Sequence, residues 1–146
     1  MKLAIAVALS HQPKLLILDE ATSGLDPIVP DEILEIFNEF TRMEDHSVLI
    51  SSHIISDLEK ISDYIAFLHQ GKLLLCEEKD RLLETYGILH VTEAKLQDIP
   101  QEAIVGKIEG KYATELLVKR AEVSGAFEVE HAGIEEIVLF LAKKEA

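Results

Sequence analysis

Two adjacent carboxylates, Asp19 and Glu20, directly follow a run of four apolar residues at positions 15–18. An apolar run without alternation is typical of a strand in a parallel sheet that is covered on both faces. Ligands of open α/β sheets bind beyond the carboxyl ends of such strands. We therefore expect these carboxylates where a phosphate-bound metal ion and an attacking water can be held. The alternative is a solvated strand end, since exposed carboxylates are common.

A histidine follows a second apolar run. Residues 47–51 form a short predicted strand, and Ser52 and His53 come directly after it. Parallel strands joined by a right-handed helical crossover end at the same edge of a sheet, so His53 is expected near Asp19 and Glu20. These residue types suit attack of water on a phosphoryl group. One carboxylate holds Mg²⁺, often through water, the other polarises the nucleophile, and the histidine hydrogen-bonds to the γ-phosphate.

The elements that must position these residues can be read from apolar periodicity and turn residues. Residues 2–11 form a nearly all-apolar helix, which implies burial on most sides. A stripe of apolar residues predicts a helix from about 31 to 43 that connects the two strands, and a shorter helix covers 54–61. The first 86 residues then continue with a hairpin of strands at 64–68 and 72–76, which turns at Gly71, and a helix at 78–86 that Gly87 ends.

The pattern changes after Gly87. Short runs with β character cover residues 88–93, 103–109, 112–118 and 126–131, and a final amphipathic helix covers 134–143. We therefore expect an α/β domain with a parallel sheet over residues 1–86, followed by a small α+β appendage over 87–146.

Composition narrows the function. The chain has 146 residues and a formal net charge of −13, which disfavours nucleic acid as its partner because phosphate contacts need clustered Lys and Arg. Its single cysteine, Cys76, cannot form an internal disulfide, which fits a reducing compartment. No apolar run reaches the roughly 20 residues that span a bilayer, so we expect no transmembrane segment of its own.

Taken together, these motifs resemble a known family. Residues 15–20 resemble the Walker B motif of ATP-binding-cassette (ABC) ATPases, Ser23-Gly24-Leu25-Asp26 resembles their D-loop, and His53 resembles their switch histidine. The strand-turn-strand at 65–72 is similar to the one that follows in transporter members. The resemblance implies a P-loop NTPase-like parallel sheet, of which residues 1–86 would be the C-terminal half, with 87–146 as an accessory region.

The resemblance also implies roles for three side chains, with ATP and Mg²⁺ as cofactors. Asp19 would position Mg²⁺, in most cases through water. Glu20 would act as the general base toward the attacking water, and His53 would contact the γ-phosphate.

The D-loop residues imply partners. Asp26 would form part of the contact with a second ATP-binding subunit in a head-to-tail dimer, and the small residues Ser23 and Gly24 would let the D-loop backbone pass close to that subunit. A transmembrane permease subunit would be the other partner. The protein would then be cytoplasmic and peripheral, held at the inner face of the cell membrane through the permease.

Several motifs of this family are missing. The chain has no G-x-x-x-x-G-K-[ST] phosphate loop, because Gly106-Lys107 is followed by Ile108 and has no glycine five residues before it. The Ser-Gly-Gly signature, the glutamine loop and an early aromatic for adenine stacking are absent too. We therefore expect the C-terminal half of a nucleotide-binding domain, which by itself neither binds nor hydrolyses ATP at a useful rate. Missing core strands would leave an exposed apolar face around residues 2–9.

Three functions stay open. The first is an ATP-hydrolysing subunit, or part of one, that powers a membrane transporter. The second keeps the ATPase but applies it to DNA repair, chromosome structure or translation, for which coiled-coil arms or basic surfaces would be expected. The third is a non-enzymatic interaction or regulatory fragment, which the missing phosphate loop favours. Whether this chain is an enzyme is therefore left undecided by its sequence.

Overall fold

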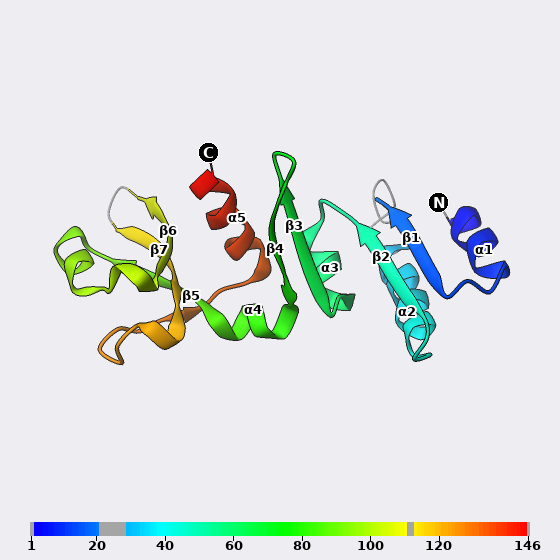
Figure 1. The fold of residues 1–146 in the computed structure, drawn as a ribbon, viewed down its shortest axis with the longest axis horizontal. Coiled ribbons are helices and arrows are strands. Elements are labelled where there is room, and N and C mark those ends of the chain that lie inside the picture. The colour runs from blue at the N-terminus through cyan, green and yellow to red at the C-terminus, as the bar shows by residue number, and fades with distance from the viewer. Residues whose placement is uncertain (1, 21–28, 111–112, 146) are drawn as a thin grey trace. The chain divides into compact units, whose positions relative to one another are not determined.

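The computed structural model describes residues 2–20, 29–110 and 113–145 (Figure 1). Its contacts divide the chain into two compact units, Met1–Ile61 and Ser62–Ala146. This division differs from the boundary between residues 86 and 87 that the sequence patterns suggest. That boundary stays a prediction.

The first unit alternates helices and strands, as predicted. Its elements are α1 (Lys2–Ser10), β1 (Leu15–Asp19), α2 (Val29–Thr41), β2 (Ser47–Ser51) and α3 (Ile55–Ile61). Strands β1 and β2 pair in parallel, with Leu15 opposite Ser47 and Asp19 opposite Ser51. The connection between them runs through α2, so the two strands end at the same edge of the sheet.

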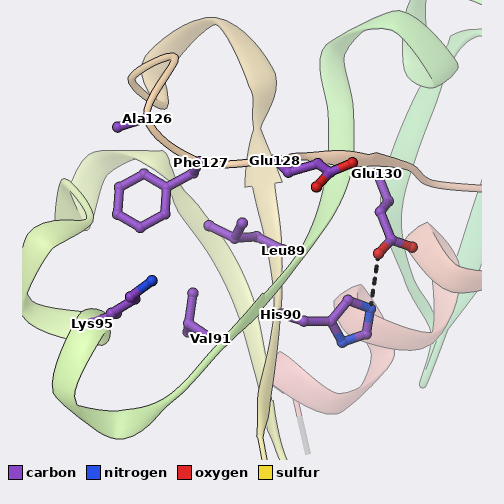
Figure 2. A pocket seen from close by; sticks show the side chains of 8 residues that line it. All are labelled: Leu89, His90, Val91, Lys95, Ala126, Phe127, Glu128 and Glu130. Atoms are coloured by element: carbon purple, nitrogen blue, oxygen red, sulfur yellow. Dashed lines mark ion pairs between the residues drawn. The ribbon is translucent and has the colours of Figure 1, made fainter.

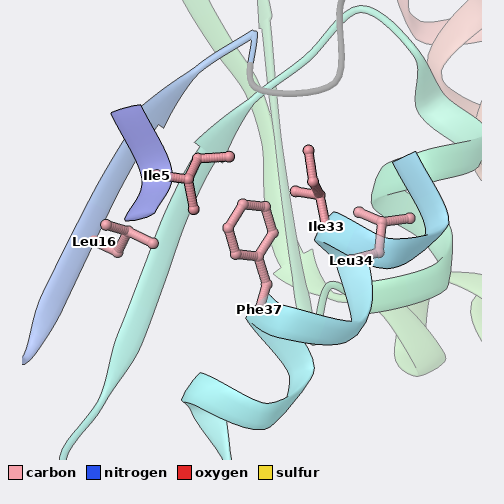
Figure 3. Packing of buried hydrophobic residues seen from close by; sticks show 5 residues of the cluster. All are labelled: Ile5, Leu16, Ile33, Leu34 and Phe37. Atoms are coloured by element: carbon pink, nitrogen blue, oxygen red, sulfur yellow. The ribbon is translucent and has the colours of Figure 1, made fainter. Parts of the chain in front are cut away.

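Helices and one face of the sheet enclose the core of this unit. Figure 3 shows its five buried side chains, which come from α1, β1 and α2: Ile5, Leu16, Ile33, Leu34 and Phe37. Partly buried residues of β2 and α3, among them Val48 and Ile61, pack against this cluster. The apolar stripe of α2 therefore faces the sheet, as its periodicity predicts.

Within the described residues of the first unit, no element covers the opposite face of the same sheet. Leu15, Ile17 and Leu49 expose 54%, 68% and 62% of their surface, whereas Leu16 exposes 4%. The expectation that β1 is covered on both faces is therefore wrong for this chain, because exposure alternates along the strand. Strand β1 nevertheless carries apolar residues on both faces, a pattern that is typical of strands covered on both faces.

Helix α1 is also less buried than predicted. Only Ile5 is well buried among its described side chains, while Leu3 and Val7 expose 78% and 53% of their surface. The expectation of burial on most sides is wrong, and the exposed apolar face expected around residues 2–9 is found.

The second unit begins with an antiparallel hairpin of β3 (Tyr64–His69) and β4 (Lys72–Glu78). Gln70 and Gly71 form its turn with φ angles of +48° and +78°, the left-handed region that two-residue hairpin turns require. The predicted hairpin and the positive φ of Gly71 are confirmed.

A four-stranded sheet with the order β6-β7-β5-β8 forms the rest of this unit. Its elements in chain order are α4 (Lys79–Thr85), β5 (Tyr86–Val91), the 3₁₀ helices η1 (Glu93–Asp98) and η2 (Gln101–Ala103), β6 (Ile104–Glu109), β7 (Thr114–Lys119), the 3₁₀ helix η3 (Arg120–Glu122), β8 (Glu130–His131) and α5 (Ile134–Glu145). The paired strands are all antiparallel.

Two predictions for this unit are wrong. Gly87 does not end a helix, because α4 stops at Thr85 and Gly87 lies inside β5. A Cβ atom at Gly87 would lie 2.4 Å from Cγ1 of Val129 and 2.7 Å from the carbonyl oxygen of Glu130, so the glycine allows a close approach of chain segments. The strand expected over 126–131 is reduced to Glu130 and His131.

Helix α5 packs on β6, where Gly106 leaves space for Phe140. The other hydrophobic cluster of this unit holds Leu89, Val91, Ile99, Leu116 and Val118. Within residues 2–20, 29–110 and 113–145, no helix combines the length and the apolar character that a bilayer crossing requires.

Candidate functional site

The carboxyl ends of β1 and β2 carry three of the predicted site residues, Asp19, Glu20 and His53. Asp19 is the last residue of β1 and pairs with Ser51, the last residue of β2. The backbone N–H of Glu20 extends the ladder by donating to the carbonyl oxygen of Ser51 at 3.0 Å. Because the two short apolar strands are parallel, the residues that directly follow each strand lie at the same edge of the sheet.

Asp19 is held by a serine of the neighbouring strand. Oγ of Ser51 donates to Oδ1 of Asp19 at 2.5 Å. This Oγ atom also accepts a hydrogen bond from the backbone N–H of Glu20 at 3.3 Å. Ser51 thus fixes the Asp19 carboxylate and the start of the next loop together. Ser51 is not among the site residues predicted from the sequence, although its place at the end of a strand parallel to β1 is the signal that identifies it.

Glu20 and His53 meet across the same edge. Nδ1 of His53 lies 2.7 Å from Oε2 of Glu20, with the side chains 69% and 39% exposed. An ionised carboxylate only accepts hydrogen bonds, so with Glu20 ionised Nδ1 carries the proton. Nε2 then stays available to a third group, as an acceptor in the neutral ring and as a donor in the charged ring.

The backbone of Glu20 is strained. Its φ angle is +50°, in the left-handed region where a residue with a Cβ atom is uncommon. Such outliers persist where the surrounding structure holds them, and they cluster at active sites and ligand clamps. In this conformation the chain leaves the strand direction at Glu20. The two adjacent carboxylates therefore have different partners: Asp19 bonds to Ser51 and Glu20 bonds to His53.

The structure thus brings together three of the six predicted site residues, Asp19, Glu20 and His53. Ser23, Gly24 and Asp26 lie outside the described residues. Whether these six residues act as the resemblance implies stays a prediction.

The donor set fits a weakly held, hydrated Mg²⁺ better than a closed metal cage. Asp19 offers one exposed carboxylate beside a serine hydroxyl. Among the residues that the structure describes, no group of three or more His, Cys, Asp or Glu side chains could hold a metal ion. Mg²⁺ suits such a sparse site because it keeps several waters and is commonly bound through one or two carboxylates plus substrate phosphates.

An exposed ion pair lies near the other ends of the two strands. Nζ of Lys14 lies 2.8 Å from Oδ2 of Asp45, and the backbone N–H of Ser47 donates to the Lys14 carbonyl at 2.8 Å. The Lys14 ammonium lowers the pKa of the Asp45 carboxyl below its usual value, with a smaller contribution from His46.

About half of this chain is similar in sequence to known proteins. No protein-family model matches the chain. Over 79 residues, 54% of this chain, it is 48% identical to the lantibiotic transport ATP-binding protein SrtF of Streptococcus pyogenes. It is 45% identical over 73 residues, 50% of the chain, to the bacitracin transport ATP-binding protein BcrA of Bacillus licheniformis. It is 38% identical over 86 residues, 59% of the chain, to the methionine import ATP-binding protein MetN 1 of Yersinia pestis.

These matches span 34%, 24% and 24% of the relatives' own lengths. The similarity therefore concerns about half of this chain and a third or less of each relative.

Proposed function

Because about half of this chain is homologous to the ATP-binding proteins of ABC transporters, we propose that it forms part of an ATP-binding and ATP-hydrolysing subunit that drives membrane transport. Residues 1–86 are the C-terminal half of a P-loop NTPase-like domain, and residues 87–146 are an accessory region. The observation that carries the proposal is the Glu20–His53 pair beside Asp19, at the shared carboxyl edge of two parallel strands.

Each of these side chains has a role in the proposal. Asp19, held by Ser51, binds Mg²⁺ through water, and the metal supplies charge neutralisation of the phosphates when bound. Glu20 accepts a proton from the attacking water, for which its second carboxylate oxygen and its partial exposure leave room. His53 donates from Nε2 to the γ-phosphate when its ring carries both protons, while Nδ1 stays on Glu20.

Partners follow from the same proposal. Ser23, Gly24 and Asp26 contact a second ATP-binding subunit in a head-to-tail dimer, and a transmembrane permease subunit receives the conformational change. The protein then works on the inner face of the cell membrane through that permease. These assignments rest on the motif resemblance and on relatives that are named for transport.

The groups that hold the phosphates are not among these 146 residues, since the sequence contains no phosphate loop. The bare face formed by Leu15, Ile17 and Leu49 supports the need for further polypeptide, because apolar residues on an uncovered sheet face indicate a missing layer. We therefore propose that ATP is bound and hydrolysed only when another polypeptide segment supplies that loop and covers this face.

Reconstitution tests this function. The 146-residue chain is mixed with a polypeptide from an ABC ATP-binding protein that carries the phosphate loop and the signature, and ATP hydrolysis is measured with Mg²⁺. We expect activity only in the mixture, and a loss of at least about a hundredfold in Glu20→Gln. Activity of the isolated chain that disappears in Glu20→Gln would contradict the need for a second segment. A mixture that assembles without activity would contradict the enzymatic assignment.

The missing phosphate loop also favours a second candidate, a non-enzymatic fragment that binds and regulates a complete ATP-binding protein. Binding of the chain to such a protein, with ATPase activity altered equally by wild type and Glu20→Gln, would support this candidate. A role in DNA repair or translation has less support, because the net charge is −13. Co-purification with an integral membrane protein, as opposed to ribosomes or DNA, separates transport from these roles.

A further inference from the structure

One edge of the four-stranded sheet in the second unit is open. Strand β6 stands at the end of the order β6-β7-β5-β8, so only its β7 side is paired. Among the residues that the structure describes, none donates to or accepts from the backbone groups on the other side of β6. An unpaired edge of this kind is a template for pairing with another chain.

The opposite edge of the same sheet is partly covered. Strand β8 pairs with Gly87 and Ile88 of β5, and Oε1 of Glu130 lies 3.9 Å from Nε2 of His90 (Figure 2). Beside β5 in the same view lies a pocket of about 340 Å³, to which Phe127 contributes. Head-to-tail pairing of β6 with β5 of another copy would meet this covered edge, which favours a symmetric pairing of β6 with β6.

The hydrogen-bond pattern of β6 shows which of its residues face the open side. The N–H of Gly110 donates to the carbonyl oxygen of Ala113 at 3.0 Å, so these two opposed residues form a hydrogen-bonded pair. Bonded and non-bonded pairs alternate along an antiparallel ladder, which makes Lys107 and Glu109 members of non-bonded pairs with β7. Their N–H and C=O groups therefore point away from β7, toward the open side.

Helix α5 does not lie along this open side. A Cβ atom at Gly106 would lie 3.1 Å from Cδ1 of Phe140. Since Cβ atoms point out of the plane of a sheet, α5 packs on a face of β6 and not beside its hydrogen-bonding edge.

The charges of Lys107 and Glu109 restrict how two copies can pair. The two side chains are 39% and 75% exposed, and Nζ of Lys107 lies 2.7 Å from Oε1 of Glu109. Three antiparallel registers bring the outward-pointing groups of these residues together. Lysine opposite lysine and glutamate opposite glutamate are repulsive, whereas lysine opposite glutamate is attractive and occurs on both sides of the symmetry axis.

We propose that two copies of this chain pair through β6 in the third register, with a two-fold axis at Ile108. Each Lys107 then lies opposite Glu109 of the second copy, and the two residues exchange both of their backbone hydrogen bonds. Ile108 lies opposite Ile108 of the second copy in a non-bonded pair. The sheets of the two copies become one continuous sheet.

A single strand edge is smaller than the interfaces of stable complexes, so isolated chains pair weakly. In the proposed transporter, two ATP-binding subunits are held by one permease, at an effective concentration on the order of 1 mM. Weak pairing would be populated there and would couple the second units of the two subunits. The pairing itself does not depend on ATP hydrolysis, because it is tested on the isolated chain.

Disulfide trapping in the 146-residue chain tests the register. All variants carry Cys76→Ser, because Cys76 is exposed. Ile108→Cys should form a disulfide-linked dimer on oxidation, since Cα atoms of a non-bonded pair lie about 4.5 Å apart, within the range that a disulfide spans. A mixture of Lys107→Cys and Glu109→Cys should also crosslink. Each of these two alone should crosslink about tenfold less, because diagonal partners lie about 7–8 Å apart. Glu115→Cys, on the inner strand β7, is the control and should stay monomeric.

Charge reversal provides a second measurement, by sedimentation equilibrium. All samples carry Ile17→Lys with Leu49→Glu, which removes association through the exposed apolar face of the first unit. Lys107→Glu should weaken dimerisation by about tenfold or more, because both cross-strand pairs become repulsive. Lys107→Glu combined with Glu109→Lys should restore it. Lys95→Glu, at an exposed position of η1, should leave it unchanged.

Three results would overturn the proposal. They are the absence of a disulfide-linked dimer in both Ile108→Cys and the mixture, equal crosslinking of the Glu115→Cys control, and dimerisation that the combined charge reversal does not restore.

Discussion

Nδ1 of His53 lies 2.7 Å from Oε2 of Glu20, although 33 residues separate them in the chain. Parallel pairing of β1 with β2 creates this proximity, because Asp19 lies opposite Ser51 and both strands end there. The pair is partly exposed, so its contribution to stability is small, in the range of about 0–1 kcal/mol. In the proposed function its significance is chemical, because Glu20 and His53 would act as an acid–base pair beside Asp19, which would bind Mg²⁺.

Two substitutions of Glu20 measure the cost of its left-handed backbone conformation separately from the loss of its carboxylate. Glu20→Gly should stabilise the chain by about 0.5–1 kcal/mol relative to Glu20→Gln, because only glycine adopts a φ of +50° without a Cβ clash. Both variants lose the charged pair with His53, so their difference isolates the strain. Urea unfolding followed by circular dichroism measures it. Equal stability of the two variants would show that the left-handed conformation costs nothing here.

Ser51→Ala should lower the free energy of unfolding by about 1 kcal/mol. The variant removes the hydroxyl that donates to Asp19 and accepts from the N–H of Glu20. Ser56→Ala, at an exposed position of α3, is the matched control and should stay within about 0.5 kcal/mol of wild type. Urea unfolding of the three proteins decides, and an equal effect of both variants would contradict the role given to Ser51.

His53→Gln should reduce ATP hydrolysis of the reconstituted mixture by at least about a hundredfold, with little change in ATP affinity. The amide of glutamine keeps a hydrogen-bond donor but cannot carry the charge that the γ-phosphate contact uses. His11→Gln, at an exposed position after α1, should hydrolyse ATP like wild type. Steady-state rates and nucleotide binding are measured side by side. A His53→Gln variant that loses binding and hydrolysis together would point to a structural role.

The bare sheet face predicts opposite effects on solubility and assembly. Ile17 and Leu49 lie opposite each other on neighbouring strands, so Ile17→Lys with Leu49→Glu places complementary charges there. This double variant should be more soluble than wild type by light scattering, yet should not assemble with the segment that supplies the phosphate loop. Leu16→Lys changes the buried face of the same strand and should unfold the unit. Normal assembly of the double variant would show that this face is not covered in the active protein.

The Lys14–Asp45 pair predicts a pH effect. Lys14 lowers the folded-state pKa of the Asp45 carboxyl, so the contribution of this carboxylate to stability is present above its unfolded pKa. That contribution is lost as the pH falls through the lowered folded pKa. Lys14→Met should return the Asp45 pKa toward its ordinary value, as measured by NMR titration of the carboxyl carbon, whereas Lys144→Met should not. An unchanged pKa in Lys14→Met would show that the pair does not persist in solution.

Local patterns identified the elements of the candidate site. Two short apolar runs and a right-handed crossover between parallel strands predict that His53 lies near Glu20, and the structure confirms that proximity. Burial was harder to predict, because exposure of Ile17 depends on which elements pack against the sheet and not on the strand itself. The pocket lined by Phe127, Lys95 and residues of β5 was not predicted, because it depends on how distant segments of the chain pack together.

Two glycines of the second unit are packed too tightly to carry a side chain, so their positions can be recognised in other chains. Gly87 has no room for a side chain against Val129, and a Cβ atom at Gly106 would lie 3.1 Å from Cδ1 of Phe140. Chains that share this unit should therefore carry a glycine at the start of one strand, a second glycine in the next strand of the sequence and an aromatic residue in the last helix. Since no family model matches the chain, this three-residue pattern is a feature by which other chains with this unit can be searched for.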